Sequence, residues 1–291
     1  MADWDGRGLP PAASARLARF KAGGVRTSLL AVNGAVGAES VGFTPIGEVM
    51  GGAVQHLGWR GYGCGMYGGG SFGTARTVTS GQGRGYAGYA PYVKALYHGY
   101  DSALRRMVAE AQAMDADGVL GVRLSVDHLD QGNREFVALG TAVRASSAPV
   151  RPRRPFTTDL AGQDFAKLLY AGWVPASIAI GISVAIRHDD WRTRQQSSSL
   201  FSGNVEVTGY TELVQFARAD ARQRFGERIQ RAGADGAIVS SMGLDLRAIE
   251  PSDNHRDHLA EATVIGSAIA RFHRGRSAPT DALTILPLRR A

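Results

Sequence analysis

The chain contains an internal repeat, and this repeat limits the folds open to it more than any other feature. Segments 92–118 and 210–236 align without a gap, from a leading tyrosine to closing Ala-Asp-Gly triplets at 116–118 and 234–236. A length of 291 residues is about two average domains. Length and repeat therefore predict two tandem α+β domains, each large enough to bury a core of its own.

Each aligned segment is typical of a long helix followed by a β-hairpin. Apolar residues recur at spacings of three and four from Leu96 to Met114, which is one face of a helix, and Asp-Gly turns then end the pattern. The alternation that follows predicts strands, which are Leu120 to Val126 with Glu135 to Arg144, and 237–246 with 261–272. The second hairpin has eight extra residues, because Asp117 and Asp235 differ by 118 positions but Thr141 and Ser267 by 126. We expect an inserted polar loop at the tip of that hairpin.

Composition shifts divide the chain further. Pro and Gly mark its ends and its middle, and a Gly- and Tyr-rich stretch interrupts the first copy. The predicted parts are a flexible N-terminal arm (1–24), a first domain (25–145) with an insertion at about 58–91, a Pro/Arg linker (146–155), a second domain (156–274) and a C-terminal tail (275–291).

One stretch raises the alternative of a membrane contact. Leu168–Ile186 carries no charge over a length near the minimum of about 17 to 20 residues for a spanning helix. The corresponding Val41–Leu57 contains Glu48 and His56, which lipid would disfavour. We therefore favour a buried strand, a turn and a core element, and the sequence leaves membrane contact open.

The overall charge and the cysteine content bear on the binding partners of the chain and on its cellular compartment. The net charge is +7, which favours acidic partners such as nucleic acid or an anionic surface, although a general arginine bias gives the same value and no nucleic-acid motif is present. The single cysteine, Cys64, excludes an intramolecular disulfide framework. The first residues lack the apolar core of a secretory signal. We expect a cytoplasmic protein.

The densest set of metal-ligand residue types is in the second hairpin. His255, Asp257 and His258 form a candidate metal site, since a His-x-x-His spacing can present two imidazoles together. Arg256 within the set favours a solvated polar loop instead. Which metal ion, if any, would bind is not specified by these residues.

Other candidates are weaker still. Cys64 beside a methionine suits a soft ion, and Tyr67 in the same Gly- and Tyr-rich stretch suits partner contact. Asp127 and Asp245 occupy the same position in both copies and are candidate ligand or partner contacts, or strand-end residues. No Ser-His-Asp or Cys-His arrangement can be assembled, so we predict no catalytic residues.

Short motifs in matching order carry a resemblance to a known family. The helix stops at 115–118 and 233–236 are followed by closing strands with Gly140-Thr141-Ala142-Val143 and Gly266-Ser267-Ala268-Ile269. This order resembles the YbjQ-like family over about 120 residues in each half. The resemblance implies a dodecin-related α+β domain with a small antiparallel sheet on one main helix, assembly into rings that are commonly pentamers, and a heavy-metal-binding label.

These observations together predict a non-catalytic oligomeric scaffold or binding protein, with a metal ion or small ligand as its partner and ring-like self-association. The alternative is an interaction module for nucleic acid or an anionic surface, through the basic and Tyr/Gly-rich segments. An enzyme is the least favoured reading.

Overall fold

The same order of elements occurs twice along the chain: a short helix, a long strand, a long helix and a hairpin. The computed structural model describes residues 4–6, 8–23, 27–57, 78–79, 89–130, 132–147, 154–197, 203–252, 255–272 and 286–287. The first half contains α2 (Val32–Ser40), β1 (Phe43–His56), α3 (Tyr89–Ala113), β3 (Gly118–Asp130) and β4 (Asn133–Ala145). The second contains α4 (Gly162–Tyr170), β6 (Trp173–His188), α6 (Thr208–Arg231), β7 (Gly236–Ser252) and β8 (His255–Arg271). The other elements are α1 (Pro11–Lys21), β2 (Val78–Thr79), β5 (Phe156–Thr157), α5 (Trp191–Ser197) and β9 (Leu286–Pro287).

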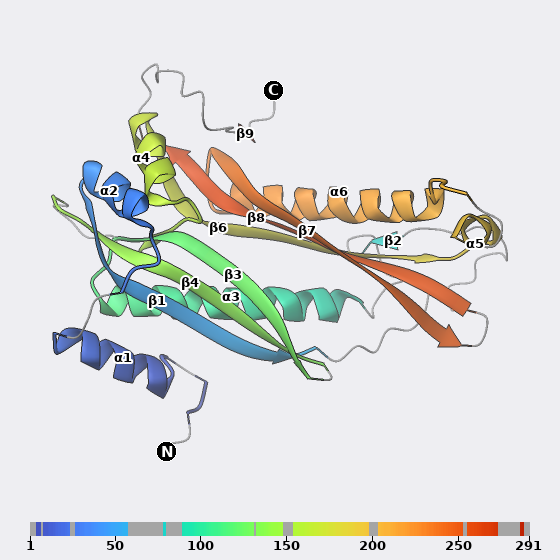
Figure 1. Cartoon of the computed structure of the whole chain (residues 1–291), viewed down its shortest axis with the longest axis horizontal. Helices are drawn as coiled ribbons and strands as arrows, with labels where there is room; N and C mark the ends of the chain where they lie inside the picture. The colour runs from blue at the N-terminus through green and yellow to red at the C-terminus, as the bar shows by residue number, and fades with distance from the viewer. Residues whose placement is uncertain are drawn as a thin grey trace.

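Two sheets and two long helices form the body of the molecule. The first sheet has the order β1-β4-β3-β5 and the second β2-β6-β8-β7-β9. Helix α3 packs on the first sheet and also contacts β6, whereas α6 packs on β6 and β8. Figure 1 shows α3 and α6 on either side of β6. The α+β fold predicted from the sequence, with a sheet and a main helix in each half, is confirmed.

Matching glycines set the same helix–sheet contact in both halves. A Cβ on Gly51 of β1 would collide with the carbonyl oxygen of Ala103 in α3. In the second half a Cβ on Gly181 would collide with the carbonyl oxygen of Ala221 in α6. Glycine is needed at these positions because the helix backbone lies directly on the strand.

The uncharged stretch 168–186 is the end of α4, a turn at Gly172 and most of strand β6. Helix α6 covers the face with Ala179 and Ala185, while Ile180 and Ile182 on the other face join the core around α3. A strand buried on both faces has no polar alternation, which is why its sequence is continuously apolar. No helix in the described part of the chain combines the length and the apolar character needed to cross a membrane.

Three local expectations differ from the structure. The second hairpin has no polar loop over 255–258, because β8 begins at His255 and the extra residues lengthen both arms. In the uncharged stretch and its counterpart the strand, β6 or β1, follows the turn instead of preceding a turn and a further element. The cores of the halves are also only partly separate. One cluster, under α6, lies wholly in the second half, but another joins residues of the first half to Ile180, Val184 and Leu259. The proposed domain boundaries stay predictions.

Candidate functional site

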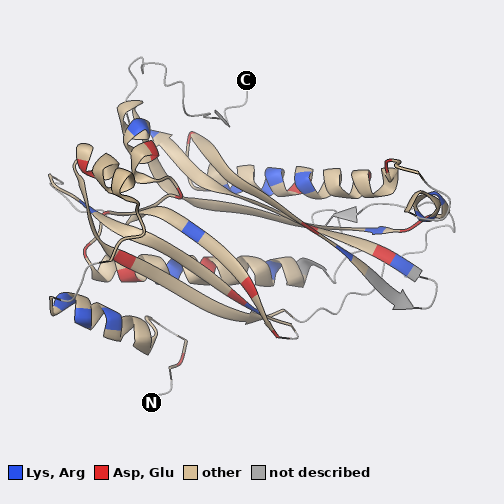
Figure 2. Ribbon diagram, viewed as in Figure 1, with Lys and Arg blue, Asp and Glu red and all other residues tan. Residues whose placement is uncertain are grey.

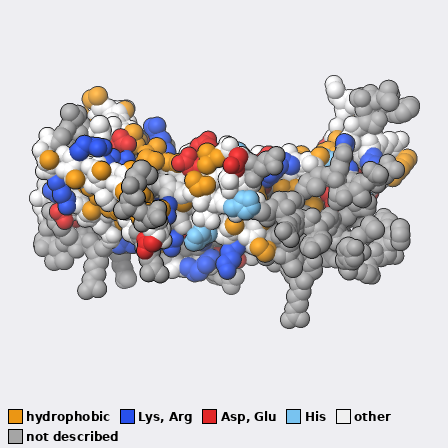
Figure 3. All heavy atoms as spheres, turned by 90° about the horizontal axis from the view of Figure 1, so that it is seen from below, with side chains coloured by type: hydrophobic (Ala, Val, Ile, Leu, Met, Phe, Trp, Pro, Cys, Tyr) orange, Lys and Arg blue, Asp and Glu red, His pale blue; other side chains and the backbone are white. Residues whose placement is uncertain are grey.

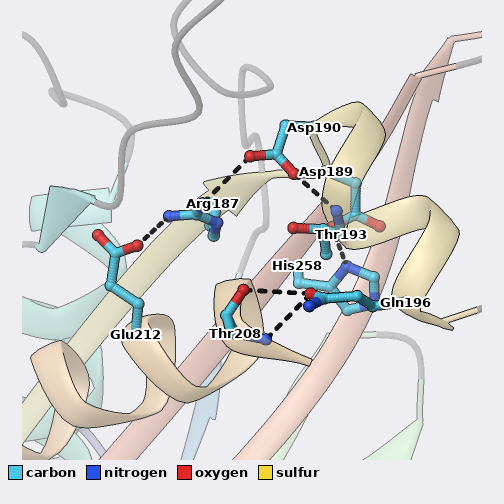
Figure 4. A network of polar contacts seen from close by, with 8 residues as sticks. All are labelled: Arg187, Asp189, Asp190, Thr193, Gln196, Thr208, Glu212 and His258. Carbon is cyan, nitrogen blue, oxygen red and sulfur yellow. Dashed lines mark hydrogen bonds and ion pairs between the residues drawn. The ribbon is translucent and has the colours of Figure 1, made fainter. Parts of the chain in front are cut away.

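The most polar part of the described interior is where β6, β8, α5 and α6 meet. We call Arg187, Asp189, Asp190, Tyr210, Glu212 and His258 the end cluster, and Figure 4 shows all of them except Tyr210. The Arg187 side chain is 7% exposed, and its Nη1 lies 2.6 Å from Glu212 Oε2 while its Nη2 lies 3.4 Å from Asp190 Oδ2. One guanidinium thus links the strand to the N-terminal part of α6 and to the residue that precedes α5.

Two aspartate–histidine pairs cross between β6 and β8. His258 Nδ1 lies 2.8 Å from Asp189 Oδ1, and His188 Nδ1 lies 2.9 Å from Asp257 Oδ1. Since successive side chains of a strand point to opposite faces, Asp257 and His258 are directed away from each other. The two pairs are therefore separate contacts and do not form one site.

Tyr210 at the start of α6 completes the first of these pairs. Its hydroxyl donates to Asp189 Oδ2 at 3.2 Å, and its ring centroid lies 4.3 Å from that of His258. Burial, followed by the charge of Asp189, raises the pKa of the Tyr210 hydroxyl. The phenol consequently stays protonated and acts as a hydrogen-bond donor.

Asp190 anchors helix α5. Its Oδ1 accepts a hydrogen bond of 2.7 Å from the backbone N–H of Thr193, as an N-terminal cap does. Burial acts to raise the pKa of this carboxyl, but the hydrogen bonds from Thr193 and the charge of Arg187 outweigh it, so that the pKa is lowered. The carboxylate stays ionised and holds α5 against the sheet.

The residues of the end cluster do not fit a metal centre. Within the described residues, no group of three His, Cys, Asp or Glu side chains is placed to hold a metal ion. Asp257 and His258 are already paired with His188 and Asp189. The side chain of His255, and all of Cys64 and Tyr67, fall outside the described residues. The candidate metal site stays a prediction from the sequence.

A second charged group lies between the halves, and we call Tyr92, Arg134, Arg247 and Glu261 the seam cluster. Glu261 accepts hydrogen bonds from the Tyr92 hydroxyl at 2.6 Å, from Arg247 at 2.8 Å and from Arg134 at 3.3 Å. Burial, and then the charge of Glu261, raises the pKa of Tyr92 to about 12. The cluster links Tyr92 of α3 and Arg134 of the first sheet to Glu261 of the second sheet.

The sequence patterns predicted only some of the residues in and around these two clusters. Asp127 and Asp245 occupy matching positions, opposite Glu135 and Glu261. Asp127 is exposed, and Asp245 is 58% exposed with one oxygen 2.9 Å from Arg247 Nε. Each aspartate thus faces a glutamate across its hairpin, and in the second half this glutamate, Glu261, is already bound by Tyr92, Arg134 and Arg247. The seam cluster was missed because its members come from different halves, which no local pattern can bring together.

The comparisons with known proteins bear on the whole chain. The family model described as "Putative heavy-metal-binding", of the YbjQ-like family, matches residues 72–146. The Mycobacterium tuberculosis protein named encapsulin nanocompartment protein Rv1762c is 32% identical over 275 residues, covering 92% of this chain and 94% of that protein. This chain belongs to the family of that protein.

Shorter relatives match part of the chain. A UPF0145 protein of Natronomonas pharaonis is 39% identical over 69 residues, which are 24% of this chain and 61% of the relative. A UPF0145 protein of Methanococcus maripaludis is 42% identical over 53 residues, which are 18% of this chain and 47% of the relative. These matches cover less than two thirds of each relative. No solved structure matches this chain.

Proposed function

We propose that this chain is a non-catalytic, self-associating structural component of a protein nanocompartment in the cytoplasm. The observation that carries the proposal is the similarity over 94% of a protein named for an encapsulin nanocompartment. A match of this length includes both halves of the chain, so the proposal concerns the complete arrangement of two sheets and two long helices. Within it, we interpret the halves as a tandem duplication of one YbjQ-like domain.

The polar clusters support a structural role. The carboxylates of Glu261 and Asp189 are each held by partners from other elements, which are Tyr92 with two arginines for the first and His258 with Tyr210 for the second. Buried networks with satisfied members fix one arrangement of the surrounding elements. This is the property needed in a building block whose shape must be repeated.

The mass of the purified full-length chain tests the proposal. We expect light scattering to give a multiple of the mass of one chain, and electron microscopy to show particles of uniform size. A mass of one chain across the accessible concentration range would contradict it. Uniform rings without closed particles would support self-association and oppose a shell-forming role.

A metal-carrying role is a second candidate, favoured by the description of the matching family model. The residues predicted from the sequence to hold the ion are His255, Asp257 and His258, with Cys64 as the candidate soft ligand. Because Asp257 and His258 point to opposite faces of β8, only one of them would join His255 unless this end of the strand rearranges. Elemental analysis of the purified protein should then detect a metal at a fixed ratio to the chain. His255→Ala with His258→Ala should remove it, whereas Cys64→Ser tests the cysteine separately.

The nucleic-acid alternative has less support. Figure 2 shows Lys and Arg spread over α1, α4, α6 and the strands, with Asp and Glu among them. On the described part of the face in Figure 3, basic, acidic and hydrophobic side chains are intermixed. A phosphate backbone is best bound by a continuous basic surface. Binding to nucleic acid at low salt that weakens steeply as salt rises would revive this alternative.

A further inference from the structure

The second half docks onto the first through its opening segment. Strand β5 pairs with β3 in parallel, at Gly118 with Phe156 and Val119 with Thr157. Beyond it, the backbone N–H of Thr158 donates to the carbonyl of Val119 at 3.0 Å, and the carbonyl of Thr158 accepts from Val122 at 2.9 Å. Residues 156–160 therefore extend the first sheet by one strand.

Helix α4 continues this contact. The Phe165 side chain is 0% exposed, and its ring lies 5.0 Å from that of Phe43 in the first half. Gly162 is so close to α2 that a Cβ would collide with the carbonyl oxygen of Gly34. We call residues 156–169 the head of the second half, and the edge of β3 with Phe43 and α2 the socket of the first.

The first half has a corresponding head, and one face of that head is exposed while Gly34 and Ala38 on its other face are buried. By position in the repeat, Thr158 corresponds to Ser28, and Gly162 and Ala166 correspond to Val32 and Val36. Thr158 and Ala166 are 0% and 6% exposed, whereas Val32 and Val36 are 83% and 60% exposed. Ser28 is exposed as well. The face with Ser28, Val32 and Val36 is thus open to solvent in the first half, whereas its counterpart is buried in the second.

The exposed head also borders a hollow. An open pocket of about 660 Å³ is lined by Ala31, Val32, Asn33, Val36, Gly37, Ser40 and Gln163. Two exposed valines one helical turn apart form a small apolar patch beside this pocket. The half-exposed Leu29 and Leu30 precede them.

The second half has a corresponding socket. The edge of β7 at Gly236 matches the edge of β3 at Gly118, and Ile238 and Val239 on that edge are half-buried. Residues 286 and 287 of β9 pair there with Ala237 and Gly236, in antiparallel orientation. Edge strands of this kind readily accept an added strand from another chain.

We infer that the exposed head of one copy, residues 27–39, binds the β7 socket of a second copy, displacing β9. This inference rests on the proposed self-association and names the contact that produces it. Because the head and the socket are different surfaces, the contact repeats from copy to copy and yields a ring or a filament. Within one chain, α4 packs on Gly34 and Gly37 of α2. In the contact between copies, the corresponding residues of the socket are the larger Asp164 and Lys167, so α2 of one copy would cross α4 of the next at a greater distance.

Charge introduced into the head provides the first test. Val32→Glu with Val36→Glu should leave the fold intact, since both side chains are exposed, and should reduce the mass measured by light scattering to that of one chain. Val205→Glu, at a valine 54% exposed elsewhere, is the matched control and should leave the mass unchanged. If the wild type assembles and the double variant still assembles, the contact between copies lies elsewhere and this inference is wrong. If the wild type itself has the mass of one chain, the proposed self-association fails first.

Cross-linking tests the direction of the contact. In a Cys64→Ser background, Asn33→Cys and Lys167→Cys are made in separate chains, then mixed and oxidised. A head-to-socket contact predicts a disulfide-linked dimer in the mixture and little in either variant alone. A dimer of Asn33→Cys with itself, and none in the mixture, would show a symmetric contact between heads and overturn the inference.

Removal of β9 tests the competition. A chain ending at residue 274 should assemble at lower concentration than the full chain, because the socket no longer has an internal occupant. Loss of assembly in this variant would mean that the C-terminal segment is part of the contact and would contradict displacement.

Discussion

Gly99 and Phe136 in the first half stand where Ala217 and Ala262 stand in the second. The ring of Phe136 lies so close to Gly99 that a Cβ there would collide with it. In the second half two small side chains share the same space, and both are 1% exposed or less. The large ring in the first half is accommodated because glycine faces it, and close-packed interiors allow such a difference only as a paired change.

Gly51→Ala and Gly181→Ala should each destabilise the chain, because the added Cβ would meet helix backbone that cannot move aside. Overpacking of this kind costs about 1 to 3 kcal/mol. Gly226→Ala in α6 is the control, since nothing lies near its Cβ position, and it should stabilise the helix by about 1 kcal/mol. Urea unfolding of the three variants gives the free energies. Equal values for Gly181→Ala and Gly226→Ala would contradict the close contact.

The pKa of Tyr92 makes stability depend on alkaline pH. It is raised to about 12 by burial and by Glu261, from an ordinary value of 10.0, so the folded state keeps a proton that the unfolded state loses. The stabilisation is complete below pH about 10 and is lost as pH rises towards about 12. Tyr92→Phe should flatten this part of the stability–pH curve. The pKa of Tyr100 is also raised to about 12, so the Tyr92→Phe variant should still lose some stability at alkaline pH.

Among the elements, the long helices and hairpins could be predicted, whereas the short helices α2 and α4 and the full length of β6 could not. Helices α3 and α6 carry apolar residues at helical spacing, and the positive φ of Asp115 and Gly233 ends them where the Asp-Gly turns predict. Helix α2 has the sequence VNGAVGAES, whose glycines oppose helix formation in isolation. It is helical because its small residues pack against α4, a tertiary contact that propensity does not contain. Strand β6 lost its alternation because two helices cover it.

The seam between the halves gives a prediction with an internal control. Glu261→Gln leaves Arg134 and Arg247 without their shared carboxylate, and breaking a largely buried pair costs about 3 to 5 kcal/mol. Glu135→Gln changes the corresponding residue of the first half, which faces no such arginine pair in the described contacts. It should alter the free energy of unfolding by less than about 0.5 kcal/mol. Similar losses in both variants would mean that the seam cluster adds nothing specific.

For the whole molecule, the repeat predicts two copies of a unit but not how the copies share a core. Ile182 of β6 is 1% exposed because α3 of the other half covers it, and the Tyr97 hydroxyl accepts a 2.8 Å hydrogen bond from its backbone N–H. Side chains that meet across halves leave no periodic trace in either half. The end cluster was predicted only in part. His258 was a candidate from the sequence, but its partner Asp189 was not, because the two residues are far apart in the sequence.

A shared core should make the two halves unfold together. If the isoleucine face of β6 were exposed by the loss of α3, several fully buried side chains would enter water, each at about 1.5 to 3 kcal/mol. We therefore expect a single calorimetric transition whose van't Hoff enthalpy matches the calorimetric enthalpy per chain, measured in the Val32→Glu, Val36→Glu variant to remove effects of assembly. Glu261→Gln should lower the midpoint of that transition without dividing it. Two separate transitions would show that the halves are independent domains and that the contact across the seam is weak.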